Sequence, residues 1–241
     1  MRASMEQVRR PAVTVSPYFV AIVAVFVTCL ITANIIAVKL VTIGPWVVPA
    51  GVVVFPVAYI VGDVLTEVYG YAAARRVIWL GFACNALAVG AIALAGALPA
   101  PSYWDAGAAY HRILGYTPRL LGASFAAYLV GEFANAYVLA RLKILTRGRF
   151  LWTRTIGSTV VGEGLDSLVF ITIAFVGTAG MDFANLRELI VTQWLIKTAY
   201  ETIATPLTYV VVGALKRVEG RDTFDVGTDF NPLALGTVEA D

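Results

Sequence analysis

Long apolar stretches alternate with short polar or turn-forming linkers along this chain. A helix needs about 20 mostly apolar residues to cross the hydrocarbon core of a bilayer. Six stretches reach that length, namely 18–41, 50–70, 76–98, 120–141, 155–178 and 189–214. None of them alternates apolar and polar residues as a strand of a membrane barrel does. The pattern therefore predicts an all-α, polytopic membrane bundle of six transmembrane helices.

Composition supports this class. Of the 241 residues, 59% are hydrophobic and only 14% are charged, with a mean hydropathy of +0.77. Globular domains carry nearly twice that share of charge. The net charge of +2 and the lack of a single basic patch exclude nucleic acid as an expected partner. We expect an N-terminal tail over 1–17, a six-helix domain over 18–215 in the lipid bilayer, and a polar, loosely ordered tail over 216–241.

The positions of Lys and Arg predict the orientation. Most of the 18 basic residues fall before the first stretch, after the last, or in the linkers around 71–75 and 142–154. Cytoplasmic loops are the ones enriched in Lys and Arg, so both termini are predicted to be cytoplasmic. The first apolar run exceeds the roughly 7–15 residues of a signal peptide, which favours a retained helix.

Away from the ends of the predicted spans lie six acids and one lysine, where each charge costs about 2.5–3.5 kcal/mol on insertion scales. They are Asp63, Glu67, Glu132, Glu163, Asp166, Lys197 and Glu201. Spacings of three or four residues put Asp63 with Glu67, Glu132 with Asn135, Glu163 with Asp166, and Lys197 with Glu201 on shared helix faces. Because lipid cannot solvate them, these faces are predicted to turn toward the bundle interior.

One tripeptide pattern recurs in three spans, as Val61-Gly62-Asp63, Val130-Gly131-Glu132 and Val161-Gly162-Glu163. Glycine before the acid lets neighbouring backbones approach closely around the carboxylate. The three acids fall at similar predicted depth, close to the level of Lys197. The pattern predicts a ring of acids around one internal cation.

Several pairings are alternatives to a ligand site. Lys197 and Glu201 could neutralise each other, Glu67 could pair with Arg75 or Arg76, and Asn34 or Asn135 could join helices by hydrogen bonds. One lysine cannot neutralise Asp63, Glu132, Glu163 and Asp166 together, so some of these acids must be protonated, solvated or bound to a ligand. A carboxylate accepts two parallel hydrogen bonds from a flat donor edge such as that of a guanine-like base. Protons or sodium also suit buried acids, and composition does not choose among these ligands.

A resemblance to a known protein family narrows the choice of ligand for these acids. The run 55–70, with Asp63 and Glu67, followed by 74–79, is similar to the signature of the queuosine precursor transporter family. Weaker matches in the same order are Thr32-Ala33-Asn34, 123–128, Glu163 to Asp166, Lys197, Phe224-Asp225 and 229–232. Members of this vitamin-uptake-like family import 7-deazaguanine bases.

The resemblance implies a multi-pass protein of the bacterial inner membrane that imports preQ0, preQ1 or queuine for tRNA modification. Its fold is expected to be similar to the substrate-binding subunits of energy-coupling-factor transporters. Asn34, Asp63, Glu67, Asp166 and Lys197 are carried over as substrate-binding candidates. Glu132, Asn135 and Glu163 join them from the acid ring. No enzyme activity, cofactor or metal is expected.

Three other functions stay open. The chain could be a binding subunit for another small vitamin that works with a separate ATPase, since it contains no Gly-rich phosphate loop. Asp63 and Asp166 could form the dyad of an intramembrane aspartyl protease. A purely structural scaffold is the last alternative. The oligomeric state, including a homo-oligomer, is not predicted.

Overall fold

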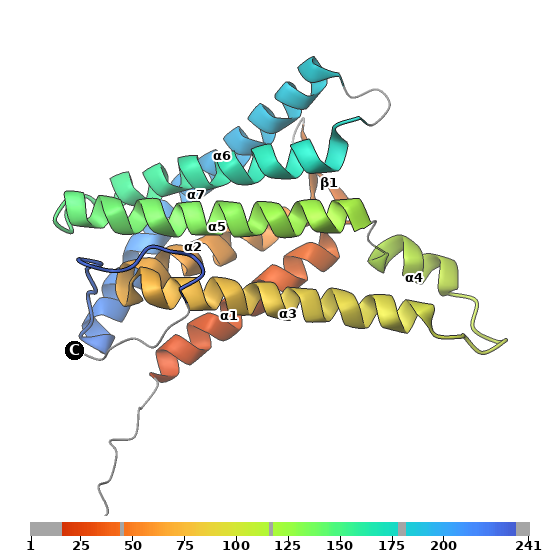
Figure 1. The fold of residues 1–241 in the computed structure, drawn as a ribbon, viewed down its shortest axis with the longest axis horizontal. Helices are drawn as coiled ribbons and strands as arrows, with labels where there is room; N and C mark the ends of the chain where they lie inside the picture. Colours follow the sequence, from red (N-terminus) through yellow and green to blue (C-terminus); the bar gives the residue numbers. More distant parts are fainter. Residues whose placement is uncertain (1–15, 44–45, 116–117, 178–181, 235–241) are drawn as a thin grey trace, which may run out of the picture.

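The protein is a bundle of long helices lying side by side (Figure 1), described by a computed structural model over residues 16–43, 46–115, 118–177 and 182–234. The long helices are α1 (Pro17–Ile36), α3 (Tyr71–Ala97), α5 (Pro118–Leu145), α6 (Leu151–Phe175) and α7 (Phe183–Glu219). The short elements are β1 (Leu40–Ile43), β2 (Trp46–Pro49), η1 (Ala50–Val53), α2 (Phe55–Val64), η2 (Leu65–Tyr69) and α4 (Gly107–Leu114).

The predicted all-α membrane bundle is confirmed. Within the described residues, four helical stretches are long and apolar enough to cross a membrane. They are Pro17–Ile36, Tyr71–Ala97, Gly107–Leu145 (α4 and α5 taken together) and Leu151–Phe175.

The first predicted span was too long. Helix α1 ends at Ile36, and Leu40–Ile43 forms an antiparallel hairpin with Trp46–Pro49, in the register that pairs Val41 with Val48. Val41, Thr42 and Ile43 are β-branched, and such side chains lower helix propensity and favour strands. The strand preference of these residues therefore explains why α1 ends at Ile36, although the apolar run continues to residue 41.

The second predicted span is not one regular helix. Residues 50–69 form a 3₁₀ turn (η1), ten residues of α-helix (α2) and a five-residue π-helical turn (η2). Single π turns inside helices occur often at functional sites. This one ends at Gly70, whose φ of +86° suits glycine. A Cβ at Gly70 would also lie 2.8 Å from the side chain of Thr223.

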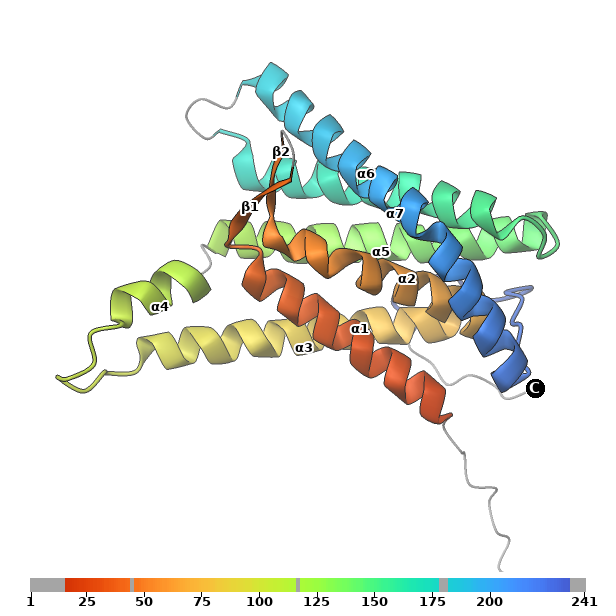
Figure 2. The ribbon, with the colours of Figure 1, turned by 180° about the vertical axis from the view of Figure 1, so that it is seen from behind.

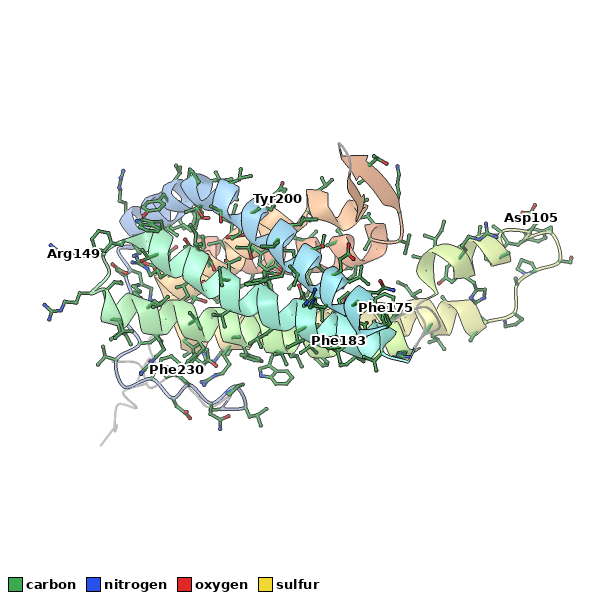
Figure 3. All side chains as sticks on the ribbon, turned by 90° about the horizontal axis from the view of Figure 1, so that it is seen from above. Asp105, Arg149, Phe175, Phe183, Tyr200 and Phe230 are labelled. Atoms are coloured by element: carbon green, nitrogen blue, oxygen red, sulfur yellow. The ribbon has the colours of Figure 1, made fainter. Side chains whose placement is uncertain are left out.

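The two ends of the bundle differ in chemistry. Figure 3 places Arg149, in the α5–α6 connection, at the opposite end from Asp105. We call the end formed by the α5–α6 connection, the start of α3 and the end of α7 the basic end. Helix α7 crosses the bundle toward it (Figure 2). There the Ser16 hydroxyl, which caps α1, donates to the carboxylate of Glu219 at the end of α7.

The tail expected over 216–241 is ordered where the structure describes it, since α7 continues to Glu219 and contacts hold the residues that follow, while 235–241 lie outside the described residues. Residues 220–234, here called the C-terminal segment, lie against η2, α3 and α5. Arg75 donates to the carbonyls of Asp229 (2.7 Å) and Asn231 (2.8 Å), and the Trp79 indole donates to the Pro232 carbonyl (2.8 Å). These contacts are to backbone carbonyls, so sequence composition gives little sign of them.

Asp225 joins the C-terminal segment to the start of α3. Both its carboxylate oxygens accept from the Tyr71 backbone N–H at 3.0 Å. The first N–H groups of a helix have no partner within it, so this carboxylate acts as a cap supplied by a distant segment. Burial raises the pKa of Asp225, against the lowering effect of the Tyr71 N–H and the Thr228 hydroxyl.

Candidate functional site

Helices α5 and α6 approach each other closely at two glycines of the recurring tripeptide. A Cβ added at Gly131 would lie 3.2 Å from the Gly162 carbonyl oxygen, and one at Gly162 would lie 3.0 Å from that of Gly131. A Cβ at Gly62 would lie 3.5 Å from a carboxylate oxygen of Glu132. The close approach predicted from the repeat is therefore confirmed for α5 and α6, and Gly62 faces the acid of another repeat.

Lys197 on α7 binds two acids of α6. Its Nζ lies 2.5 Å from Asp166 Oδ2 and 2.8 Å from Glu163 Oε2. The alternative in which Lys197 and Glu201 neutralise each other is wrong, because neither carboxylate oxygen of Glu201 has a hydrogen-bond partner. Lys197 therefore pairs with acids on the neighbouring helix α6 and not with Glu201, one turn away on α7.

Asp63 on α2 and Asn135 on α5 form a second polar pair. The Asn135 amide donates to Asp63 Oδ1 at 3.0 Å, and both residues are buried. The other carboxylate oxygen, Asp63 Oδ2, and the amide oxygen, Asn135 Oδ1, have no hydrogen-bond donor. A buried acceptor without a donor costs about 1–3 kcal/mol. The pair thus presents two acceptors that an incoming donor can satisfy.

A small cavity lies beside this pair, between α1, α2, α3 and α5. Its lining residues are Phe26, Gly62, Leu65, Thr66, Ala74, Ile78, Glu132, Asn135 and Ala136. It has room for about one water molecule. A larger ligand can enter only if the helices around it move apart.

Glu67 lies in a separate cluster near the basic end. Its carboxylate, fully buried, receives two hydrogen bonds from Arg154 (2.7 and 2.8 Å) and one from Lys216 (2.6 Å). Lys143 lies 3.6 Å from the same carboxylate and donates to the Glu67 backbone carbonyl at 2.5 Å. The expected pairing of Glu67 with Arg75 or Arg76 is wrong for Arg75, which binds the C-terminal segment instead.

Asp222 of the C-terminal segment completes this cluster. Its carboxylate lies 2.5 Å from Lys143 Nζ and 2.8 Å from Lys216 Nζ. Partial burial alone would raise the pKa of Asp222, but the hydrogen bonds from the two lysines outweigh it and hold the pKa below its usual range. We call Glu67, Lys143, Arg154, Lys216 and Asp222 the basic-end cluster.

Sequence reasoning missed the cationic members of this cluster. Lys143 and Arg154 were interpreted as loop charges that set orientation, yet they are 1% and 2% exposed. The available signal was their position inside the ends of apolar helices rather than in the linker between them.

Asn34, on α1, donates to Asn85 on α3 at 3.1 Å.

The predicted site residues thus fall into three groups. Glu132 and Asn135 line the cavity, Asp63 bonds to Asn135 beside it, and Glu163 and Asp166 bind Lys197. Glu132 lies close enough to Asp63, Asp166 and Lys197 to interact electrostatically with each of them, so these residues form one group. Glu67 belongs to the basic-end cluster, and Asn34 pairs with Asn85. Their role as substrate ligands stays a prediction.

Buried acids and amides inside an apolar helical bundle define a class, that of multi-pass membrane proteins with a polar site at membrane depth. The chain belongs to the family described as "Putative vitamin uptake transporter", whose model matches residues 49–211.

Two curated relatives agree with this family. The chain is 31% identical to the "Probable queuosine precursor transporter" of Bacillus subtilis (strain 168), over 74% of this chain and 78% of that protein. It is 27% identical to the "Queuosine precursor transporter" of Escherichia coli (strain K12), over 50% of this chain and 52% of that protein. No solved structure matches the chain, so the likeness to energy-coupling-factor subunits stays a prediction.

Proposed function

We propose that this protein imports queuosine precursors, 7-deazaguanine bases such as preQ0 and preQ1, for tRNA modification. Two relatives named for this substrate class support the proposal. The observation that carries it is the buried pair of Asp63 and Asn135, which offers two adjacent acceptors without donors. The N1–H and exocyclic amine of a deazaguanine form an edge of adjacent donors that can satisfy them.

Glu132 gives the site a second acid at the cavity wall, and Phe26 gives it an aromatic face. In the proposed binding mode the base lies between these elements, with its donor edge toward Asp63 and Asn135. The cavity holds about one water molecule in this conformation. Binding therefore requires the helices around α2 and α5 to separate, as in alternating access around a mid-membrane site.

Uptake in cells tests the proposal. The host would lack its own precursor synthesis and its own precursor transporter, and queuosine in its tRNA would be measured after feeding preQ0 or preQ1. The gene should restore queuosine, and Asp63→Asn should abolish the recovery because one carboxylate acceptor becomes an amide. Asp105→Asn makes the same chemical change at an exposed residue far from the site, and it should have no effect. Full recovery with Asp63→Asn would exclude the proposed binding mode.

We further propose that the basic end faces the cytoplasm of a bacterial inner membrane, with both termini on that side. Arg149 lies at that end (Figure 3), and the basic-end cluster adds Lys143, Arg154 and Lys216, which supports this orientation. A reporter that fluoresces only in the cytoplasm, fused after Asp241, should be active. An inactive fusion in a full-length, membrane-inserted protein would reverse the orientation.

Transport without a partner ATPase is part of the proposal. The competing function is a vitamin-binding subunit, and it predicts co-purification with an ATP-binding protein and no uptake by the chain alone in liposomes. The protease alternative is disfavoured by the pairing of its two acids. Asp63 bonds to Asn135 and Asp166 to Lys197, whereas an aspartyl dyad needs the two carboxyls to share a proton.

A further inference from the structure

We propose that Glu201 on α7 is a proton-binding site, and that its proton is exchanged in each transport cycle, which couples uptake to the proton gradient. This inference rests on the proposed import of 7-deazaguanines. It assigns a role to a residue outside the predicted substrate-binding set.

Glu201 is buried without a partner. Its side chain is 2% exposed, and neither of its carboxylate oxygens has a hydrogen-bond donor. The nearby Thr205 hydroxyl donates to the Glu201 backbone carbonyl (3.0 Å) and not to its carboxylate. Glu201, Thr205 and Thr208 form the buried face of α7, which packs against α2 and α6.

The charged groups that face Glu201 are mostly acids. Asp63 on α2, Glu132 on α5 and Glu163 on α6 lie close enough to repel an ionised Glu201. On α7 itself, Lys197 binds Asp166 and Glu163. Glu67 on η2, four residues after Asp63, is paired with Arg154 and Lys216.

An ionised carboxylate in this place would be buried, unpaired and repelled. Burying a charge without a partner is so costly that such a group takes up a proton instead. A metal ion does not fit as well, because the described residues contain no group of three or more His, Cys, Asp or Glu side chains placed to hold one.

The position of Glu201 on α7 suits coupling. Pro206 lies inside the same helix five residues later, and it has no N–H for the carbonyl of Thr202. A helix bends most easily at such a point. Loss of the proton leaves a charge that requires water or a cation, and the hinge at Pro206 lets the half of α7 nearer the basic end move to admit water.

Purified protein in liposomes tests this coupling. With one proton per neutral base, a gradient of one pH unit, acidic outside, supports about tenfold accumulation of labelled preQ0. Wild-type protein should accumulate the base with the proton gradient and not with a sodium gradient. Glu201→Gln should lose this accumulation, while labelled and unlabelled base still exchange at a measurable rate. Glu188→Gln, an exposed acid on the same helix, should behave as wild type.

Infrared spectroscopy gives a readout that does not depend on transport. At neutral pH the wild-type protein should show the C=O stretch of a protonated carboxylic acid that Glu201→Gln lacks and Glu188→Gln retains. Should Glu201→Gln not insert into the membrane, titration of this band in Glu188→Gln protein decides instead.

The outcomes separate the two proposals. Accumulation driven by sodium alone, gradient-driven accumulation that survives Glu201→Gln, or absence of the infrared band would each overturn the proton site. Failure of wild-type protein to move any 7-deazaguanine base, with the band present, would overturn the proposed function and leave Glu201 as a proton site without that cargo.

Discussion

Single residues in this bundle are held by charge pairs that cross between helices, and Glu67 has three cationic partners. Arg154 and Lys216 bond to its fully buried carboxylate, and Lys143 lies 3.6 Å away. Removing one partner of a buried ion pair costs about 3–5 kcal/mol, because the other charges stay buried without compensation. Glu67→Ala leaves three cations with only Asp222 among them.

We therefore expect Glu67→Ala to lower thermal stability strongly in detergent and to reduce the amount of folded protein in the membrane. Thermal unfolding followed by size-exclusion chromatography measures both. Glu188→Ala removes an exposed acid from α7 and should leave the melting temperature unchanged. Equal melting temperatures for the two variants would show that the basic-end cluster contributes little to the fold.

Lys197 shows how far residue-level prediction reaches. Helical spacing correctly placed Glu163 and Asp166 on one face of α6, and it indicated a cation at similar depth. It could not choose between Glu201, on the same helix, and the acids of α6, because that choice depends on how α6 and α7 cross. Spacing within a helix predicts a shared face but not the neighbour that the face meets.

Individual elements follow the apolar pattern except where backbone chemistry intervenes. The pattern located α3, α5 and α6 to within a few residues. It missed the hairpin after Ile36 because hydropathy does not distinguish an apolar strand from an apolar helix. It also missed the π turn over Leu65–Tyr69, whose end depends on the positive φ of Gly70 and the approach of Thr223. Neither the hairpin nor the π turn alters the hydropathy of the chain, so the apolar pattern could not reveal them.

The contact between α5 and α6 depends on small residues at one level. A Cβ at Gly131 would lie 2.8 Å from the Cβ of Asp166, which is closer than side chains pack. We expect Gly131→Ala to push α6 away and to cost about 1–3 kcal/mol, as overpacking does. Because Asp166 moves with α6, its ion pair with Lys197 should weaken and uptake should fall.

Gly122→Ala is the matched control for this prediction, since it lies on the same helix and a Cβ there meets nothing within 4 Å. It should be neutral or stabilise α5 by about 0.5–1 kcal/mol, through helix propensity alone. Thermal unfolding and uptake would be measured for both variants. Comparable stability of the two would mean that α5 and α6 can separate at Gly131 without cost.

At the scale of the whole molecule, the predicted ring of Asp63, Glu132 and Glu163 around Lys197 differs from the structure in its contacts with the cation. Glu163 binds Lys197 directly, whereas Glu132 lies close enough to Lys197, Asp166 and Asp63 to interact with them electrostatically. Glu67, a predicted substrate ligand outside that ring, lies in the basic-end cluster. Depth along each span was predictable, but the tilt of α7 across the bundle was not (Figure 2). That tilt lets the middle of α7 supply Lys197 and its end supply Lys216.

The C-terminal segment connects this architecture across its basic end. Asp222 bonds to Lys143 and Lys216, Asp225 caps α3 through the Tyr71 N–H, and Arg75 holds two carbonyls of the segment. Without these residues Lys143 keeps only Glu67 as a partner, and the first N–H of α3 loses its acceptor. Truncation after Gly220 should therefore lower the melting temperature and the amount of folded protein.

Truncation after Ala234 is the control, because it keeps all of these contacts. Asp225→Ala isolates the cap, and loss of a helix cap costs about 0.5–2 kcal/mol. Its melting temperature should fall between those of the two truncations. If truncation after Gly220 leaves the melting temperature unchanged, Glu67 and water must compensate the buried cations at this end without Asp222. In that case the basic end is open to water rather than closed by its own chain.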